Sequence, residues 1–122
     1  ERKGIGNLAH SPLGKGLLTG RYEPGHVFPA DDERSERPPF QGELFARYLG
    51  AAKSLEEVAA DKGITLVQMA IAWCLRQPAV SCVLVGAKGE DQVKEHVGAS
   101  EVSFTADELT RIDGILQNAP SD

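Results

Sequence analysis

The chain has 122 residues, the length of a single domain. Its formal net charge is −5, which argues against a nucleic-acid partner, since binding a nucleic acid requires a basic surface that displaces counterions. Its apolar runs are a few residues long, far short of the roughly 20 residues that cross a membrane as a helix. We therefore expect neither a nucleic acid nor a membrane as partner.

The two cysteines, Cys74 and Cys82, lie in apolar stretches and have no zinc-binding spacing. Cysteines in such stretches are typically reduced core residues, so we expect a cytoplasmic protein with two buried thiols. The chain opens at Glu1 without a methionine and runs almost directly into a predicted strand, as expected of a piece of a longer protein.

The first predicted element is a strand at residues 5–10, which is apolar and ends at Ser11-Pro12. Residues 11–42 predict a long loop, because five of the seven prolines fall there. A loop of this length inside a domain is typically a functional lid or a disordered excursion. The cluster of charges at residues 31–37 predicts solvated surface.

Two helices are predicted next. Apolar residues recur at helical spacing over residues 43–62, and Gly63 stands where a left-handed C-cap belongs. The second helix is predicted over residues 65–77, because Thr65 and Gln68 have the spacing of a capping box and a proline follows the last residue.

The run at residues 80–85 is apolar and rich in β-branched residues, which predicts a parallel strand buried on both faces. A glycine-containing turn at residues 86–89 leads into a predicted helix at residues 90–97. A last helix is predicted over residues 106–116, capped by Thr105.

The order of elements predicts an α/β fold with a parallel sheet and right-handed crossovers. Two strands alone leave both sheet edges unpaired, so we expect this piece to need the rest of a barrel or a partner chain.

Both turns that follow the predicted strands have features of an anion site. Residues 10–20 carry three glycines, a serine and Lys15, and glycines let backbone N–H groups approach an anion closely. Residues 85–92 place Lys88 beside a helix N-terminus. Neither turn matches the standard dinucleotide or P-loop pattern, so each taken alone is equally compatible with a plain connection.

The two turns support each other if the strands are the last two of a (β/α)8 barrel. In such barrels, phosphate sites are commonly built from the loops after strands seven and eight. We therefore predict that both turns bind one phosphate-bearing ligand.

Three collinear motifs resemble aldo-keto reductases of the bacterial and potassium-channel β-subunit-like branch. The sequence SPLGKGLLTGRY at residues 11–22 resembles the segment after the seventh strand of that family. The sequence GITLVQMAIAWCL at residues 63–75 is similar to the helix before the eighth strand. VGAK at residues 85–88, with Gln92, Glu95 and His96, resembles the adenosine-phosphate motif.

The resemblance covers nearly the whole chain and implies the C-terminal part of a (β/α)8 TIM barrel over residues 1–122. This would be an incomplete barrel that contains the last two strands with their helices. Residues 11–42 would be its long loop, and residues 86–97 its adenosine-phosphate-binding turn and helix.

The resemblance also implies an NADP(H) site. Ser11, Leu13 and Lys15 would line the pyrophosphate, and Lys88, with help from Gln92, would lie near the 2′-phosphate. Glu95 would accept a hydrogen bond from the adenine amino group. The implied cofactor-binding residues are His10, Ser11, Pro12, Leu13, Gly14, Lys15, Gly16, Gly86, Ala87, Lys88, Gln92, Glu95 and His96.

Two of these positions depart from the family pattern. His10 stands where an aromatic residue normally stacks on the nicotinamide, and His96 replaces the usual asparagine. Lys88 stands where the family often has arginine or serine, and a lysine lacks the bidentate fork of arginine.

Members of the family reduce aldehydes and ketones with a hydride from the nicotinamide, using a tyrosine, a lysine, an aspartate and a histidine. The resemblance implies that these four residues lie on strands that would precede Glu1, so we expect no catalytic residue in this chain.

Three interpretations stay open. The chain is the cofactor-binding part of a reductase, a non-catalytic nucleotide-binding module, or an interaction or assembly element from a truncated barrel. Its expected partners are the dinucleotide and either a second copy or a complementary barrel half.

Overall fold

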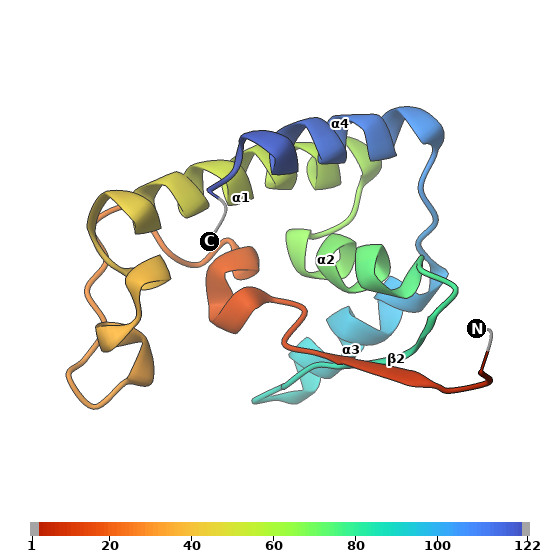
Figure 1. Cartoon of the computed structure of the whole chain (residues 1–122), viewed down its shortest axis with the longest axis horizontal. Coiled ribbons are helices and arrows are strands. Elements are labelled where there is room, and N and C mark those ends of the chain that lie inside the picture. The colour runs from red at the N-terminus through yellow and green to blue at the C-terminus, as the bar shows by residue number, and fades with distance from the viewer. Residues whose placement is uncertain (1–2, 121–122) are drawn as a thin grey trace.

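The computed structural model describes residues 3–120, which form a small parallel sheet covered on one face by helices (Figure 1). In chain order the elements are β1 (Asn7–His10), η1 (Gly14–Thr19), η2 (Glu33–Glu36), η3 (Pro38–Phe40), α1 (Gly42–Lys62), α2 (Leu66–Leu75), β2 (Val80–Leu84), α3 (Glu90–Gly98), η4 (Ala99–Glu101) and α4 (Ala106–Asn118), where η denotes a 3-10 helix.

The helices form layers above the sheet. Helices α1 and α4 lie side by side, and α2 lies between them and the strands (Figure 1). The main core fills the space between α1, α2 and α4, with Ala59, Met69 and Ile112 at its centre. A second cluster, which contains Val67, packs α2 against Val83 of the sheet.

Local chemistry sets the helix ends, as predicted. Gly63 ends α1 in the left-handed conformation, with φ of 76°, and its N–H donates to two carbonyls of the last turn. Capping boxes begin α2 at Thr65 and α4 at Thr105, and the partner side chains are Gln68 and Glu108. Each box satisfies two backbone N–H groups that a helix start leaves without a partner.

Residues 11–41 contain neither strand nor α-helix, but they are not a featureless loop. They contain the three 3-10 helices η1, η2 and η3 and fold around an aromatic cluster in which Phe28 and Phe40 are buried and pack against Phe45 of α1. Burial of large aromatic side chains stabilises this segment much as it would a small core.

Strands β1 and β2 pair in parallel, as predicted, with Leu8 opposite Cys82 and His10 opposite Leu84. Parallel neighbours end at the same edge of a sheet. The turns that follow His10 and Leu84 therefore leave the sheet side by side.

The prediction that residues 80–85 are buried on both faces was wrong. Val83 packs against α2, but Cys82 and Leu84 are exposed on the opposite face, together with Leu8 of β1. The physical reason is that nothing within residues 3–120 covers that face. Side chains on a strand alternate between faces, so every second residue is left in solvent.

Because nothing within residues 3–120 covers that face of the sheet, the expectation that both cysteines lie in the core was also wrong. Both thiols are free, but Cys82 is exposed and only Cys74 is half-buried. Burial raises the pKa of the Cys74 thiol.

No single helix within residues 3–120 has the length and apolar character to cross a membrane. Helices α1 and α2 meet those criteria only as a joined pair, and the chain bends by 90° between them.

We expect the 122-residue chain by itself to self-associate, because Leu8 and Leu84 are 61% and 51% exposed beside unpaired strand edges. Leu84→Lys places a charge on that face and should raise the monomer fraction in sedimentation velocity. Val27→Lys is the control, because Val27 is 84% exposed in the loop. A wild-type chain that is a monomer with a sharp thermal transition would contradict this prediction.

Candidate functional site

The parallel pairing brings the two predicted turns to one hollow of about 570 Å³ at the sheet edge. The turn after β1, the turn after β2 and one side of α3 line it. Twelve of the predicted site residues lie there: His10, Ser11, Pro12, Leu13, Lys15, Gly16, Gly86, Ala87, Lys88, Gln92, Glu95 and His96. The thirteenth, Gly14, does not line the hollow; it turns the chain with φ of 55°, and its N–H donates to the Ser11 carbonyl over 3.1 Å.

The turn after β1 is tightly wound. Ser11 and Lys15 both have φ of 55°, a conformation that side chains with a Cβ adopt at some cost in energy. The Leu13 carbonyl accepts from the N–H groups of Gly16 and Leu18, each over 3.1 Å. These bonds hold the turn closed and leave the Lys15 side chain on its outer side.

His10 ends β1 at the base of the hollow. Its side chain is exposed, and its Nδ1 lies 3.1 Å from Ser11 Oγ, within hydrogen-bond distance. This contact places the imidazole beside the turn.

The turn after β2 is shaped by α3. Gln92 Oε1 accepts from the backbone N–H of Lys88 over 2.7 Å, which folds the turn back onto the helix. Gly89 is the N-cap of α3 and makes no side-chain bond to the first N–H groups of the helix. Lys94 pairs with Glu90 at 2.7 Å, whereas the Lys88 side chain lies at the hollow.

Four polar residues line the same hollow but were not among the predicted site residues. They are Thr19, Arg21, Tyr22 and Arg34. The charges at residues 31–37 predicted only solvated surface, and for Arg34 that was wrong, because it is half-buried. The available signal was an arginine between acidic residues in a loop that also supplies tyrosine and phenylalanine.

Arg34 ties the loop to the first turn. Its Nε donates to Asp32 over 2.9 Å, and its guanidinium carbon stacks 4.3 Å from the Phe28 ring centre. Its Nη1 donates to Tyr22 Oη over 2.9 Å and to the Lys15 carbonyl over 3.1 Å. Hydrogen bonds from Arg34 hold the pKa of the Asp32 carboxyl well below its usual range.

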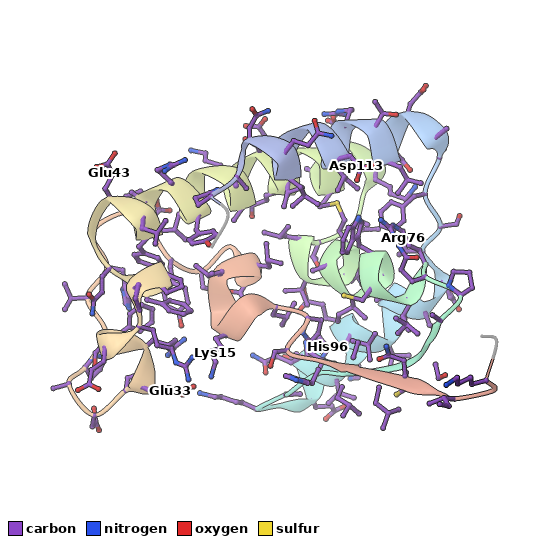
Figure 2. All side chains as sticks on the ribbon, viewed as in Figure 1. Lys15, Glu33, Glu43, Arg76, His96 and Asp113 are labelled. Atoms are coloured by element: carbon purple, nitrogen blue, oxygen red, sulfur yellow. The ribbon has the colours of Figure 1, made fainter. Side chains whose placement is uncertain are left out.

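A second link joins the two segments through Lys15 and Glu33, whose side chains form an ion pair (Figure 2). The other carboxylate oxygen of Glu33 accepts from Arg37 over 3.0 Å. Both bonds lower the pKa of Glu33, and the bond from Lys15 has the larger effect. His96, on α3, belongs to the opposite wall of the hollow (Figure 2).

No cluster of three or more His, Cys, Asp or Glu side chains within residues 3–120 is placed to hold a metal ion. A second, more open hollow of about 670 Å³ lies between α1 and α4, away from both turns. Its walls carry arginines and a glutamate, and none of the predicted site residues lies there.

The Asp32–Arg34 bond predicts a pH dependence of stability. A carboxyl whose pKa is lowered by folding stabilises the fold above its ordinary pKa of 3.8 and loses that contribution as the pH falls below it. Asp32→Asn should therefore lower the Tm at neutral pH, and the difference from wild type should shrink between about pH 5 and about pH 2. Asp31→Asn, at the exposed neighbouring position, is the control for thermal scans. A difference that does not change with pH would contradict the role of this bond.

The comparison with known sequences identifies one family. Residues 1–117 match the model of the aldo/keto reductase family. A probable voltage-gated potassium channel subunit beta from Oryza sativa subsp. japonica is 34% identical to the chain, and the alignment covers 96% of the chain and 37% of that protein. The similarly named protein from Arabidopsis thaliana is 35% identical with the same coverage. An aldo-keto reductase from Strobilurus tenacellus is 32% identical over 89% of the chain and 32% of its own length.

Solved structures agree with this assignment. A glycerol dehydrogenase from Gluconobacter oxydans superposes with a TM-score of 0.88 and 33% identity, over 99% of the chain and 38% of that structure. The chain thus spans about a third of the length of the curated relatives it matches. It belongs to the aldo/keto reductase family, and its fold is the C-terminal part of a (β/α)8 barrel, with two parallel strands and their helices.

Proposed function

We propose that the hollow binds NADP(H) and that the chain is the cofactor-binding part of a reductase acting on aldehydes or ketones. The observation that carries this proposal is the convergence of two glycine-containing turns, each with a lysine, on one hollow at the ends of parallel strands. Phosphate sites in barrels are commonly built at this place, and family membership favours a nicotinamide dinucleotide as the ligand.

The turn after β1 is the proposed pyrophosphate site. Ser11 and Lys15 would face the phosphates, and the strained turn brings backbone groups close to them. Arg21 and Arg34 line the same hollow. Arg21 would add positive charge that the sequence motif alone did not reveal, whereas the guanidinium of Arg34 is already bound by Asp32. Arginine binds phosphate oxygens in a bidentate fashion, which fixes orientation as well as charge.

The turn after β2 is the proposed site of the adenosine 2′-phosphate. Lys88 would supply the charge, and Gln92 would orient the turn through its bond to the Lys88 N–H. Glu95 and His96 line the wall on the α3 side, where the adenine would lie. His10 would stack on the nicotinamide, held in place by its contact with Ser11.

Bound NADPH supplies a hydride to a carbonyl carbon, and the carbonyl oxygen then needs a proton from a nearby acid. We assign no residue of this chain to that role. The Tyr22 hydroxyl already accepts a hydrogen bond from Arg34 and lies in the loop. We propose that the family's tyrosine, lysine, aspartate and histidine are supplied by the complementary part of the barrel, which would also cover the exposed sheet face.

The free thiols of Cys74 and Cys82 support a cytoplasmic location.

One observation favours a second candidate function, assembly through the sheet. Leu8, Cys82 and Leu84 form an exposed apolar face, and the two-stranded sheet has unpaired edges to which further strands would add. In that case the chain would serve as an interaction element whether or not it binds a dinucleotide.

Lys88→Ala should weaken NADPH binding about tenfold and change NADH binding by less than about twofold, because only NADPH carries the 2′-phosphate. Fluorescence titration of each reduced cofactor would measure both affinities. Lys94→Ala is the matched control, since Lys94 is on α3, the helix that follows the turn, and pairs with Glu90. Equal losses for the two cofactors would remove the 2′-phosphate role of Lys88.

The 122-residue chain alone should not reduce aldehydes or ketones at a measurable rate, since it is proposed to lack the proton donor. Oxidation of NADPH, followed by its absorbance with a panel of simple carbonyl compounds, would measure this. Turnover by the purified chain that survives rigorous repurification would overturn the proposal that catalysis needs the complementary part of the barrel.

A further inference from the structure

Glu33 forms an ion pair with Lys15, the lysine that the proposed function assigns to the pyrophosphate. The Glu33 carboxylate pairs with Lys15 Nζ across the gap between η2 and η1 (Figure 2). The two side chains are 58% and 38% exposed, so the pair is accessible to a ligand. A phosphate that approaches Lys15 therefore meets a carboxylate already in place.

Asp32, next to Glu33 in the chain, is bound by Arg34 instead. The hydrogen bonds from Arg34 are the main reason why the pKa of the Asp32 carboxyl lies well below its usual range. Residues 32–33 thus carry two negative charges, and the one on Glu33 pairs with a lysine that would bind a phosphate of the cofactor.

We propose that Glu33 competes with the cofactor pyrophosphate for Lys15, so that it sets the affinity for dinucleotides by lowering it. This inference rests on the proposed function, because it takes the pyrophosphate to lie at Lys15. Binding would break the Lys15–Glu33 pair and replace a carboxylate with a phosphate on the same ammonium group.

Replacing the Glu33 carboxylate with a phosphate at Lys15 would disturb only nearby contacts, because Glu33 and the backbone of Lys15 each keep another contact. Glu33 retains its bond to Arg37 at 3.0 Å, so its charge is not left unpaired. Arg34 still donates to the Lys15 carbonyl, which keeps the loop attached to η1. Breaking an exposed pair of this kind changes an equilibrium by about two- to fivefold, which is the size of effect we expect on affinity.

The competition has a signature that separates it from the role of Lys88. The pyrophosphate is common to NADPH and NADH, so Glu33→Gln should tighten the binding of both cofactors by the same factor, about two- to fivefold. A residue that acts at the 2′-phosphate would change NADPH binding alone.

The experiment measures NADPH and NADH affinities by fluorescence titration of the whole polypeptide in which this sequence occurs. Glu36→Gln is the matched control. Glu36 is exposed and lies in the same 3-10 helix, and its substitution changes the net charge by the same amount. The same substitution is also tested in Lys15→Gln. There, Glu33→Gln should not increase the affinity for either cofactor, because the lysine for which Glu33 competes is absent. Backbone amide exchange of residues 33–40, measured without cofactor, should be the same in wild type, Glu33→Gln and Glu36→Gln, because Arg34 keeps the loop attached to η1 in all three. A rise in Glu33→Gln would mean that release of the loop, and not competition for Lys15, changes the affinity.

Each outcome bears on one proposal or on both. Equal tightening by Glu33→Gln and Glu36→Gln would mean that net charge alone is responsible and would overturn the competition. Unchanged affinity in Glu33→Gln, with normal binding by the wild type, would overturn it while leaving the proposed function intact. No binding of either cofactor by any of these proteins would reject the proposed function and the competition together.

Discussion

The parallel pairing of β1 with β2 is the constraint on which the rest of the structure depends. Because His10 and Leu84 are partners in register, the turns that follow them leave the sheet at one edge and line one hollow. An antiparallel pairing would have sent the same two turns to opposite edges. The lysines at 15 and 88 would then belong to separate surfaces, and neither turn alone has the features of a complete phosphate site.

Helix packing supports this pairing from one side only. Val83 anchors β2 to α2, and α2 is in turn buried against α1 and α4. The main core lies on the side of α2 that faces α1 and α4, whereas the strands that place the site have one exposed face. Within residues 3–120, the helices therefore supply most of the buried core residues.

Features set by near neighbours in the chain could be predicted from the sequence, and features set by distant ones could not. The caps at Gly63, Thr65 and Thr105 need only a few adjacent residues, so their sequence signals were sufficient. Burial of residues 80–85 depends on what covers the sheet, which the strand pattern does not specify. The Arg34 contacts join residues 12 and 19 positions apart around an aromatic cluster, and a charge pattern cannot reveal such a fold.

The same Arg34 contacts change how the charge of the hollow should be understood. Counting Lys15, Lys88 and Arg34 as three cations would describe a strongly anion-binding surface. Asp32 and Glu33 already pair with two of those groups, so part of the positive charge is compensated before any ligand arrives. Opposite charges within about 4 Å largely cancel each other's field at longer range. Under the proposed function, the affinity for phosphate would therefore depend on breaking these ion pairs as well as on the number of basic residues that line the hollow.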